Sequence, residues 1–240
     1  NFLLRKLVVN IVPVSRKILE KPISFALIRD AVEAFNVAQL GVAGYEADDL
    51  IATYARLAHE AGMAATIVSS DKDLMQLIRP GIGMYDPMKE IHIGPEEVYK
   101  KFGASPEKVV EIQALAGDST DNVPGVPGVG IKTAAALIAE YGDLDTLLTR
   151  AGEIKQPKRR ANLLEYADLA RVSRELVRLR DNAPTPLPLS DLAREKPDPE
   201  QLLTFLREQE FISVVTRLQS KLGIEETALQ SDEPVLPSEC

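Results

Sequence analysis

The sequence predicts a layered α/β domain followed by a helical domain. Three patterns predict this fold class: helical spacing on both sides of a short apolar run, a hairpin pattern directly after them, and helical spacing from about residue 105 onward. Helix, buried strand and helix in succession are typical of layered α/β folds. We expect the α/β domain at residues 25–104 and the helical domain at 105–222, between an atypical N-terminus (1–24) and a tail or linker (223–240).

The α/β half begins with two predicted helices. Apolar residues recur at helical spacing over 24–40, and EADDLIATYARLAHEAG begins a second helix that we expect Gly62 to end. The apolar, partly β-branched run AATIVSS (64–70) predicts a buried strand, and DKDLMQLI after it predicts a loop and a helical turn. GMYDPMKEIHIG predicts a hairpin with Asp86 and Pro87 in its turn.

Helices dominate the rest of the predicted order. Gly94 and Pro95 open one of them, because proline suits the first turn of a helix and the glutamates that follow suit its positive end. SPEKVVEIQALAG and KTAAALIAEYG predict two more, on either side of a loop rich in Gly and Pro. Residues 151–180 are helical and basic, and 181–200 are Pro-rich and extended. PEQLLTFLREQEF and SVVTRLQSKLG predict the last two helices.

The composition fits a globular chain without a membrane span. Of the 240 residues 45 % are hydrophobic, yet no apolar run approaches the ~20 residues that a transmembrane helix needs. Cys240 is the single cysteine, so a reducing, cytoplasmic compartment fits. The first residue is not Met, so we expect a fragment or a processed chain. The net charge of −8 at first argues against a nucleic-acid partner.

Acidic residues gather in three short clusters, each beside an apolar run. Any one cluster has a plain explanation as a solvated helix terminus, because Asp favours caps. Together they indicate a cation site, because adjacent carboxylates resist burial unless something neutralises them. One cluster directly follows the predicted strand, where α/β folds place ligand sites. The clusters are Glu46, Asp48 and Asp49 in GYEADDL, Asp71 and Asp73 in SSDKDL, and Asp118 and Asp121 in GDSTDN.

The ligand chemistry of these clusters indicates a particular class of metal. Hard oxygen ligands without His or Cys partners favour Mg²⁺ or Mn²⁺ over zinc. Two such ions a short distance apart form an apparatus for cutting phosphodiesters, in which one activates water and the other stabilises the leaving oxygen. The spacing therefore supports a two-metal nuclease as a hypothesis.

A glycine-rich loop in NVPGVPGVGIKTAAALI (122–138) joins two predicted helices. Gly125, Gly128 and Gly130 can take positive φ and allow another backbone to approach closely. Free N–H groups at the start of the second helix, near Lys132, suit the phosphates of a duplex. The Walker A spacing is absent, and no strand leads into the loop as a dinucleotide fingerprint requires. A tight helical hairpin with glycines for packing is the alternative interpretation.

Three motifs in this order resemble the 5′-3′ exonuclease domain of bacterial DNA polymerase I, a relative of the flap endonucleases: GYEADDLIATYA, SSDKDLMQLI and LAGDSTDNVPGVPGVGIKTA. The resemblance runs from about Phe25 to about Leu222 and is most specific over 44–140. It implies a PIN-like 5′ nuclease α/β domain, N-terminally truncated, followed by a helical helix-hairpin-helix DNA-binding domain. The implied activity is hydrolysis that removes 5′ ends, RNA primers and flaps in DNA replication and repair.

The resemblance also assigns residues and partners. It implies that two Mg²⁺ or Mn²⁺ ions are bound, directly or through water, by Glu46, Asp48, Asp49, Asp71, Asp73, Asp118 and Asp121. It implies that a duplex with a 5′ flap or nick is held by its phosphates, often with a monovalent cation, at Gly125, Val126, Gly128, Val129, Gly130, Lys132 and Thr133. A covalently linked polymerase domain in the full-length protein and a location at the bacterial nucleoid follow from the same resemblance.

The clusters also explain the net charge. Seven of the 36 acidic residues belong to them, and the remaining 29 nearly balance the 28 Lys and Arg residues. The acidity is then concentrated where cations bind, which leaves a basic face for DNA at Lys132, Lys155, Lys158, Arg159 and Arg160. A solvated helix face is the alternative interpretation of the basic run.

The N-terminal segment departs from the family pattern. Members begin with a strand that carries a metal-binding Asp, and a second Asp precedes a basic helical arch. Residues 1–24 contain no Asp, and Glu20 is their single acid. We expect an out-of-frame or misassembled 5′ end of the gene, with a divergent natural N-terminus as the alternative. Because the missing strand is central in such sheets, we expect 64–70 to have an unpaired edge.

Three functions remain open at this point. The leading hypothesis is a Mg²⁺-dependent 5′-3′ exonuclease and flap endonuclease module, and the second is a catalytically impaired DNA-binding remnant of one. The third is a metal-dependent phosphatase on an unrelated α/β fold, although a small phosphate ester needs no duplex clamp. Lys72 either neutralises the acids beside it or contacts phosphate, and Tyr45 either packs in the core or stacks on a nucleotide.

Overall fold

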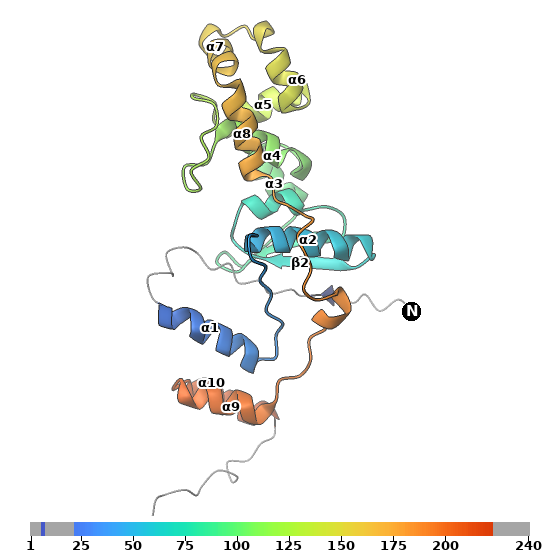
Figure 1. Cartoon of the computed structure of the whole chain (residues 1–240), viewed down its shortest axis with the longest axis vertical. Coiled ribbons are helices and arrows are strands. Elements are labelled where there is room, and N and C mark those ends of the chain that lie inside the picture. The colour runs from blue at the N-terminus through green and yellow to red at the C-terminus, as the bar shows by residue number, and fades with distance from the viewer. Residues whose placement is uncertain (1–5, 8–21, 223–240) are drawn as a thin grey trace, which may run out of the picture. The chain divides into compact units, whose positions relative to one another are not determined.

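The computed structural model describes residues 6–7 and 22–222 (Figure 1). Within this part of the chain, contacts group the residues into two compact units, one formed by 6–7 with 40–193 and the other by 22–39 with 194–222. Almost all of the predictions for 1–24 and all of those for the tail at 223–240 fall outside the described residues.

The first unit contains a four-stranded sheet in the order β1-β2-β3-β4. The first three strands are parallel and the last is antiparallel to β3. The predicted hairpin over GMYDPMKEIHIG is therefore confirmed. The expected unpaired edge of 64–70 is wrong, because β1 pairs with one side of β2 and β3 with the other. The strands are β1 (Lys6–Leu7), β2 (Ala64–Val68), β3 (Ile82–Asp86) and β4 (Ile91–Ile93).

Helix α2 (Ala47–Glu60) packs along β2 (Figure 1). At its start, the Asp49 side chain accepts from the backbone N–H of Glu46 at 3.3 Å. Acidic residues in this first turn also suit the positive end of the helix. Its apolar face is buried against the sheet, and the helix ends before Gly62, whose φ of +68° ends the helical geometry as predicted.

Short helices make up the remainder of the first unit, as the helical spacing from about residue 105 onward predicts. Helices α4 and α8 lie side by side, and α5 packs on α4 (Figure 1). One buried cluster joins them to the sheet through side chains such as Ile112, Leu115 and Ile138. The segment predicted as wholly extended, 181–200, contains the turn η5. The elements are η2 (Asp73–Leu77), α3 (Pro95–Phe102), η3 (Pro106–Lys108), α4 (Val109–Ala116), α5 (Ile131–Tyr141), α6 (Leu144–Thr149), η4 (Ala151–Glu153), α7 (Pro157–Glu165), α8 (Ala167–Val177) and η5 (Leu189–Leu192).

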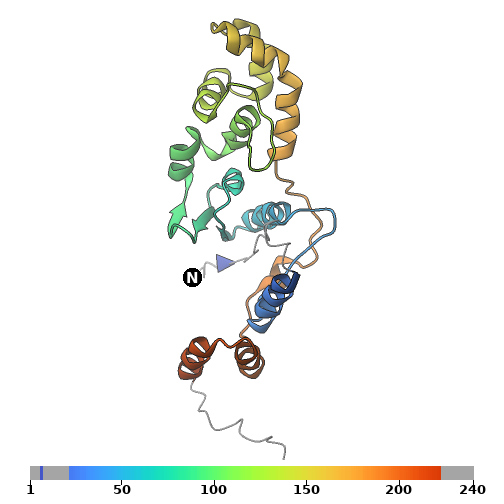
Figure 2. The ribbon, with the colours of Figure 1, turned by 90° about the vertical axis from the view of Figure 1, so that its left-hand side faces the viewer.

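The second unit is a small group of three helices, with α9 and α10 running beside each other (Figure 2). The helix predicted over 24–40 ends early, because the chain turns at Asn36 with a φ of +52°. None of the helices in the described part of the chain is long and apolar enough to span a membrane. The three helices are α1 (Pro22–Ala34), α9 (Pro199–Glu208) and α10 (Ile212–Leu222), and their buried side chains are Ala34, Leu202, Leu203, Leu206 and Val215.

Candidate metal and nucleic-acid site

Three predicted site acids meet in the first unit. Asp73 begins the turn η2 after β2, whereas Asp118 and Asp121 lie in the turn that follows α4. One carboxylate oxygen of each lies within 4.8 Å of the others. The turn is closed by paired hydrogen bonds between the backbones of Asp118 and Val123, at 2.8 and 2.7 Å. This geometry directs oxygen ligands from two separate parts of the chain toward one point.

Asp48, on the first turn of α2, lies in the field of this group. Burial raises the pKa of its half-buried carboxyl to about 7, and further negative charge adds to the shift. The charges responsible are those of Asp71, Asp73, Glu46 and Asp49, in that order of size. The second predicted cluster therefore lies within electrostatic reach of both the first and the third. A cation bound near Asp48 would favour its ionised form.

Asp73 is held by a residue that the sequence analysis did not single out. Gln113 is 2 % exposed on α4, and its Nε2 donates to Asp73 Oδ1 at 2.5 Å. Burial raises the pKa of Asp73, the bond from Gln113 opposes that rise, and the charge of Asp71 adds to it. Burial, followed by the charges of Asp118 and Asp71, also raises the pKa of Asp121. The sequence feature that could have indicated Gln113 is a single amide side chain within the run VVEIQALAG.

Lys72 supplies the internal positive charge. Its Nζ forms an ion pair with Asp118 Oδ2, and the Asp118 side chain is 5 % exposed. Burial alone would raise the pKa of Asp118, but the Lys72 ammonium and the backbone N–H of Thr120 outweigh it and lower the pKa. In this structure Lys72 therefore neutralises a site acid, which is one of the two roles left open for it.

Asp49 has a different environment from its neighbour Asp48. Its Oδ2 accepts from the backbone of Glu46 at 3.3 Å, and its Oδ1 accepts from the backbone of Arg180 at 2.8 Å. Both oxygens thus hold backbone groups. Glu46 is the exposed cap of the same helix. A metal-binding role for these two acids stays a prediction, whereas their part in capping α2 is visible.

The glycine-rich loop divides into a packed half and an open half. Gly125 is buried with a φ of +62°, and a Cβ added there would lie 2.4 Å from the backbone nitrogen of Gly117. The backbone that approaches Gly125 therefore belongs to the same chain. Its N–H donates to the buried Ser173 Oγ at 3.0 Å. Val126 and Val129 are also packed in the core, at 2 % and 4 % exposed.

The open half of the loop faces solvent. Gly128 is exposed with a φ of +75°, and nothing lies within 4 Å of a Cβ built at Gly130. Gly130 caps α5 without a side-chain bond, so the first N–H groups of α5 have no partner within the helix. Lys132 is exposed in that first turn and Thr133 is half-buried. This end of α5 suits an anion such as a phosphate.

Predicted basic residues lie beside the open half. Asn162 on α7 donates to the carbonyl of Pro127 at 2.7 Å, which fixes α7 against the loop. Lys158, Arg159 and Arg160 occupy the first turn of α7, and Lys155 precedes it. Three of these four are exposed, and Arg159 is half-buried. The structure thus supports a local basic surface near the glycine loop.

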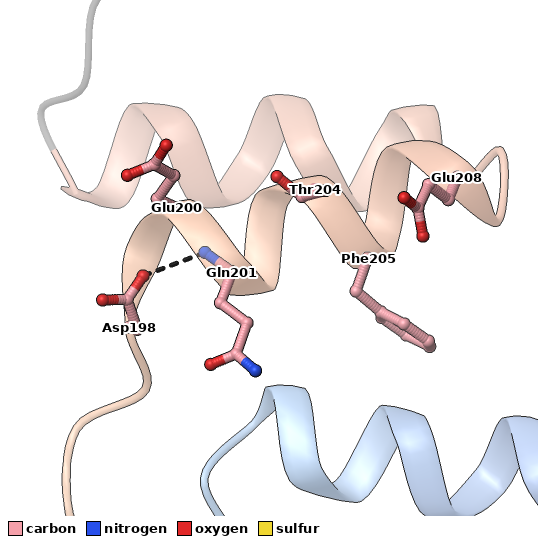
Figure 3. A pocket seen from close by; sticks show the side chains of 6 residues that line it. All are labelled: Asp198, Glu200, Gln201, Thr204, Phe205 and Glu208. Atoms are coloured by element: carbon pink, nitrogen blue, oxygen red, sulfur yellow. Dashed lines mark hydrogen bonds between the residues drawn. The ribbon is translucent and has the colours of Figure 1, made fainter.

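A shallow pocket in the second unit contains none of the predicted site residues (Figure 3). Its lining comes from α9 and the residue before it. Asp198 caps that helix by accepting from the backbone of Gln201 at 2.9 Å. The lining residues are Asp198, Glu200, Gln201, Thr204, Phe205 and Glu208.

Two protein-family models match the chain. A model described as the 5′-3′ exonuclease, N-terminal resolvase-like domain, matches residues 19–103. A second model, the 5′-3′ exonuclease, C-terminal SAM fold, matches residues 104–200. The chain belongs to the 5′-3′ exonuclease family. The predicted resemblance to this domain of DNA polymerase I is confirmed, and the family match also includes residues 19–24, which the sequence analysis placed outside it.

Individual relatives in this family are bacterial DNA polymerases. DNA polymerase I of Rhizobium leguminosarum is 52 % identical over 206 residues, which are 86 % of this chain and 20 % of that protein. The thermostable enzyme of Thermus thermophilus is 39 % identical over 196 residues, 81 % of this chain and 23 % of that protein. DNA polymerase I of Bacillus subtilis is 34 % identical over 195 residues, 80 % of this chain and 22 % of that protein. The chain spans less than a quarter of the length of these relatives.

Two solved structures share the fold of the chain. T5 5′-exonuclease with bound zinc ions has a TM-score of 0.62 at 21 % identity, covering 81 % of this chain and 71 % of that one. The catalytic core of Rad2 in complex with a DNA substrate has a TM-score of 0.53 at 15 % identity, covering 88 % and 69 %. The predicted class, a PIN-like 5′ nuclease α/β domain followed by a helical domain, is confirmed.

Proposed function

We propose that this chain is a 5′-3′ exonuclease and flap endonuclease module that hydrolyses phosphodiesters of DNA and of RNA primers by two-metal catalysis. The observation that carries the proposal is the meeting of Asp73, Asp118 and Asp121 within 4.8 Å in a member of the 5′-3′ exonuclease family. The proposal assigns nuclease chemistry to residues 25–104 together with the turn after α4, and duplex binding to 105–222. Family membership leaves the phosphatase hypothesis without support.

The acidic group fits Mg²⁺ or Mn²⁺ on the chemistry of its donors. Its ligand atoms are carboxylate oxygens, which hard divalent cations prefer. Burial and the charges of four neighbouring acids raise the pKa of Asp48, and the ammonium of Lys72 pairs with Asp118. We assign the ions to Asp73, Asp118 and Asp121, with Asp48, Asp71, Glu46 and Asp49 acting directly or through water. When bound, such a pair supplies an activated water and stabilises the leaving oxygen.

The chain's own residues keep this site in shape. Gln113 orients the carboxylate of Asp73, and the ion pair with Lys72 holds Asp118 near the end of the sheet. Because Gln113 and Asp118 are buried, the two carboxylates are held in place before any ligand arrives. A preorganised arrangement of this kind supports chemistry that depends on accurate placement of a phosphate.

DNA binding is assigned to the open half of the glycine loop. Gly128, Gly130, Lys132 and Thr133 present backbone N–H groups and one ammonium, to which α7 adds its basic first turn. We propose contacts to the phosphates of duplex DNA with a 5′ flap or nick, with a monovalent cation at the loop and little sequence preference. The proposal places the full-length protein, with its polymerase domain, in the bacterial cytoplasm at the nucleoid.

The metal assignment is tested by Asp121→Ala, with Asp118→Ala as a second variant. Removal of one ligand lowers Mn²⁺ affinity by at least about tenfold, because the loss of even an outer-shell partner costs roughly 10–100-fold. Affinity for a 5′-flap duplex in EDTA changes much less. Isothermal titration with Mn²⁺ and fluorescence anisotropy with the duplex measure the two affinities. Asp168→Ala, at a fully exposed acid on α8, is the matched control.

Identical Mn²⁺ binding by the parent and both variants would show that these two residues are surface acids. Asp121→Ala is the cleaner of the two, because Asp118→Ala also removes the partner of Lys72.

A second candidate function is a catalytically impaired DNA-binding module. It is favoured because residues 1–24 contain no Asp and do not match the N-terminal strand and arch region in which family members carry two metal-binding Asp residues. Flap cleavage with Mn²⁺ distinguishes the candidates, because the impaired module binds the flap duplex and releases no product.

A further inference from the structure

A strap of residues 177–187 runs from the end of α8 toward η5 and is bonded to the site-bearing elements. Gln76 Nε2 donates both to the carbonyl of Asp73 and to that of Val177, each at 2.9 Å, and Gln76 Oε1 accepts from the backbone of Leu179 at 3.1 Å. One amide thus joins the strap directly to the turn that carries a site acid. The start of the strap has a defined position relative to Asp73.

The same strap is bonded along α2. Thr53 Oγ1 accepts from the backbone of Ala183 at 3.0 Å, and the Tyr54 hydroxyl donates to the carbonyl of Leu187 at 2.6 Å. Arg56 Nε donates to the carbonyl of Asp181 at 2.8 Å. These hydrogen bonds and the bonds to Gln76 hold strap residues on both sides of Arg180, which is exposed. Its backbone is therefore anchored at the acidic end of α2.

Asp49 completes this anchor. Its Oδ1 accepts from the backbone N–H of Arg180 at 2.8 Å, while its Oδ2 holds the N–H of Glu46. The carboxylate is therefore used by backbone groups and does not pair with the guanidinium. Asp48, the preceding residue of α2, lies in the field of the site acids.

The Arg180 guanidinium is the part that lacks a partner. It lies over the ring of Tyr45, with Cζ 6.0 Å from the ring centroid. Within the described part of the chain, it forms neither a hydrogen bond nor an ion pair. By contrast, Arg178 lies 3.8 Å from Glu175, and Arg56 pairs with Glu60. A guanidinium that lies over a ring face keeps its N–H donors free, and these donors suit a phosphate.

We propose that Arg180 contacts a phosphate of the DNA strand that enters the acidic group, as a positioning residue; this rests on the proposed function. The strap sets the position of its backbone, and the Tyr45 ring supports its side chain. The carboxylates around it bind cations and repel phosphate, so one unpaired arginine beside them supplies local attraction for the strand. In addition to the role at the ions proposed above, Asp49 holds the backbone of Arg180.

The test compares Arg180→Gln with Arg178→Gln, a control with the same charge change two residues away. Affinity for a 5′-flap duplex is measured in EDTA across a salt series. One lost phosphate contact lowers affinity about 3–10-fold and reduces the salt slope by about one. Arg178→Gln leaves both near the parental value, and Arg180→Lys recovers part of the loss.

Neutral phosphates locate the contact. Single methylphosphonates are placed in turn at each phosphate around the flap junction. At one of these positions, the methylphosphonate lowers the affinity of the parent about as much as Arg180→Gln does. The same methylphosphonate does not lower the affinity of the Arg180→Gln variant any further. A fold defect in Arg180→Gln would instead lower affinity for every duplex alike, without this coupling.

Two results overturn the inference in different ways. Equal affinity and salt slope for the parent, Arg180→Gln and Arg178→Gln, with a parent that binds the duplex, would refute the role of Arg180 alone. A parent that binds neither Mn²⁺ nor the flap duplex would refute the proposed function and this inference with it.

Discussion

Asp48 and Asp49 show how much depends on the direction of one side chain. They are adjacent in the sequence and chemically identical, yet Asp49 accepts two backbone N–H groups while Asp48 is surrounded by other acids. Burial and the neighbouring acids raise the pKa of Asp48 and so favour its protonated form. Asp49 thus contributes hydrogen bonds to the backbone, whereas the carboxylate of Asp48 is available to a cation.

Asp48 makes the metal-free protein less stable as the pH rises. Its pKa in the folded state, about 7, exceeds the ordinary 3.8, so between these values the folded chain holds a proton that the unfolded chain has lost. The stabilisation is therefore complete below about pH 4 and lost as the pH rises to about 7. The Asp48→Asn variant lacks this contribution to the pH dependence of the free energy of unfolding. Urea unfolding in EDTA between pH 4 and pH 8 measures it.

Two controls accompany the Asp48 measurement. Asp168→Asn changes a fully exposed acid and leaves this pH dependence as in the parent. Added Mg²⁺ stabilises the parent most at the upper end of the pH range, because the ions and the protons compete for the same carboxylates. A parent and an Asp48→Asn variant with superimposable stability profiles in EDTA would contradict the assigned pKa.

At the scale of a single element, the glycine loop PGVPGVG contains two glycines, Gly125 and Gly128, that serve different purposes. Gly125 packs its backbone on Gly117, and Gly128 opens to solvent. An alanine at Gly125 meets backbone atoms in addition to the strain of positive φ. We expect it to lower the free energy of unfolding by about 2–5 kcal/mol, from overpacking plus the left-handed conformation. Urea unfolding of Gly125→Ala measures the loss, and a parental midpoint would contradict the close packing at this position.

Gly128→Val tests the open half of the same element. The side chain obstructs the approach of a phosphate backbone and lowers affinity for duplex DNA, while stability falls by only about 1–2 kcal/mol from the positive φ. Gly142→Val is the matched control, because Gly142 also has a positive φ and open space but lies at the other end of α5. Anisotropy across a salt series measures binding, and equal affinity for Gly128→Val and the parent would contradict the assignment of this loop to DNA.

At the scale of the whole molecule, the 240-residue chain is expected to bind flap DNA better than it cuts it. Residues 1–24 contain no Asp, and they supply neither of the two N-terminal Asp residues that complete the metal site in the family pattern. A displacement of ~1 Å in the substrate can already lower a rate ~10²-fold. We therefore expect 5′-flap cleavage at least ~10²-fold slower than by a relative with these acids, even with Mn²⁺.

A labelled 5′-flap duplex with Mg²⁺ or Mn²⁺ measures this rate. Replacing residues 1–24 by the corresponding segment of a relative recovers the activity if the acids are what is missing. Full-rate cleavage by the unaltered 240-residue chain would show that its own N-terminal residues suffice for catalysis.

Local sequence patterns determined most of the elements and the family. Helical spacing and the hairpin turn at Pro87 depend on residues a few positions apart, so the sequence alone predicted them. The three acidic clusters and the glycine loop are also contiguous motifs. Their order was sufficient to assign the chain to the family that the comparison confirms.

Only the tertiary structure decided which of these residues share a site. The bond from Arg180 to Asp49 joins residues 131 positions apart, and Gln113 reaches Asp73 across 40. The pairing of β1 with β2, which the sequence argued against, is likewise long-range. Spacing along the chain limits which side chains share a face, but packing between distant segments sets where each carboxylate points. For that reason the acids were predictable as a set, whereas which of them bond to backbone groups and which meet in a candidate cation site was not.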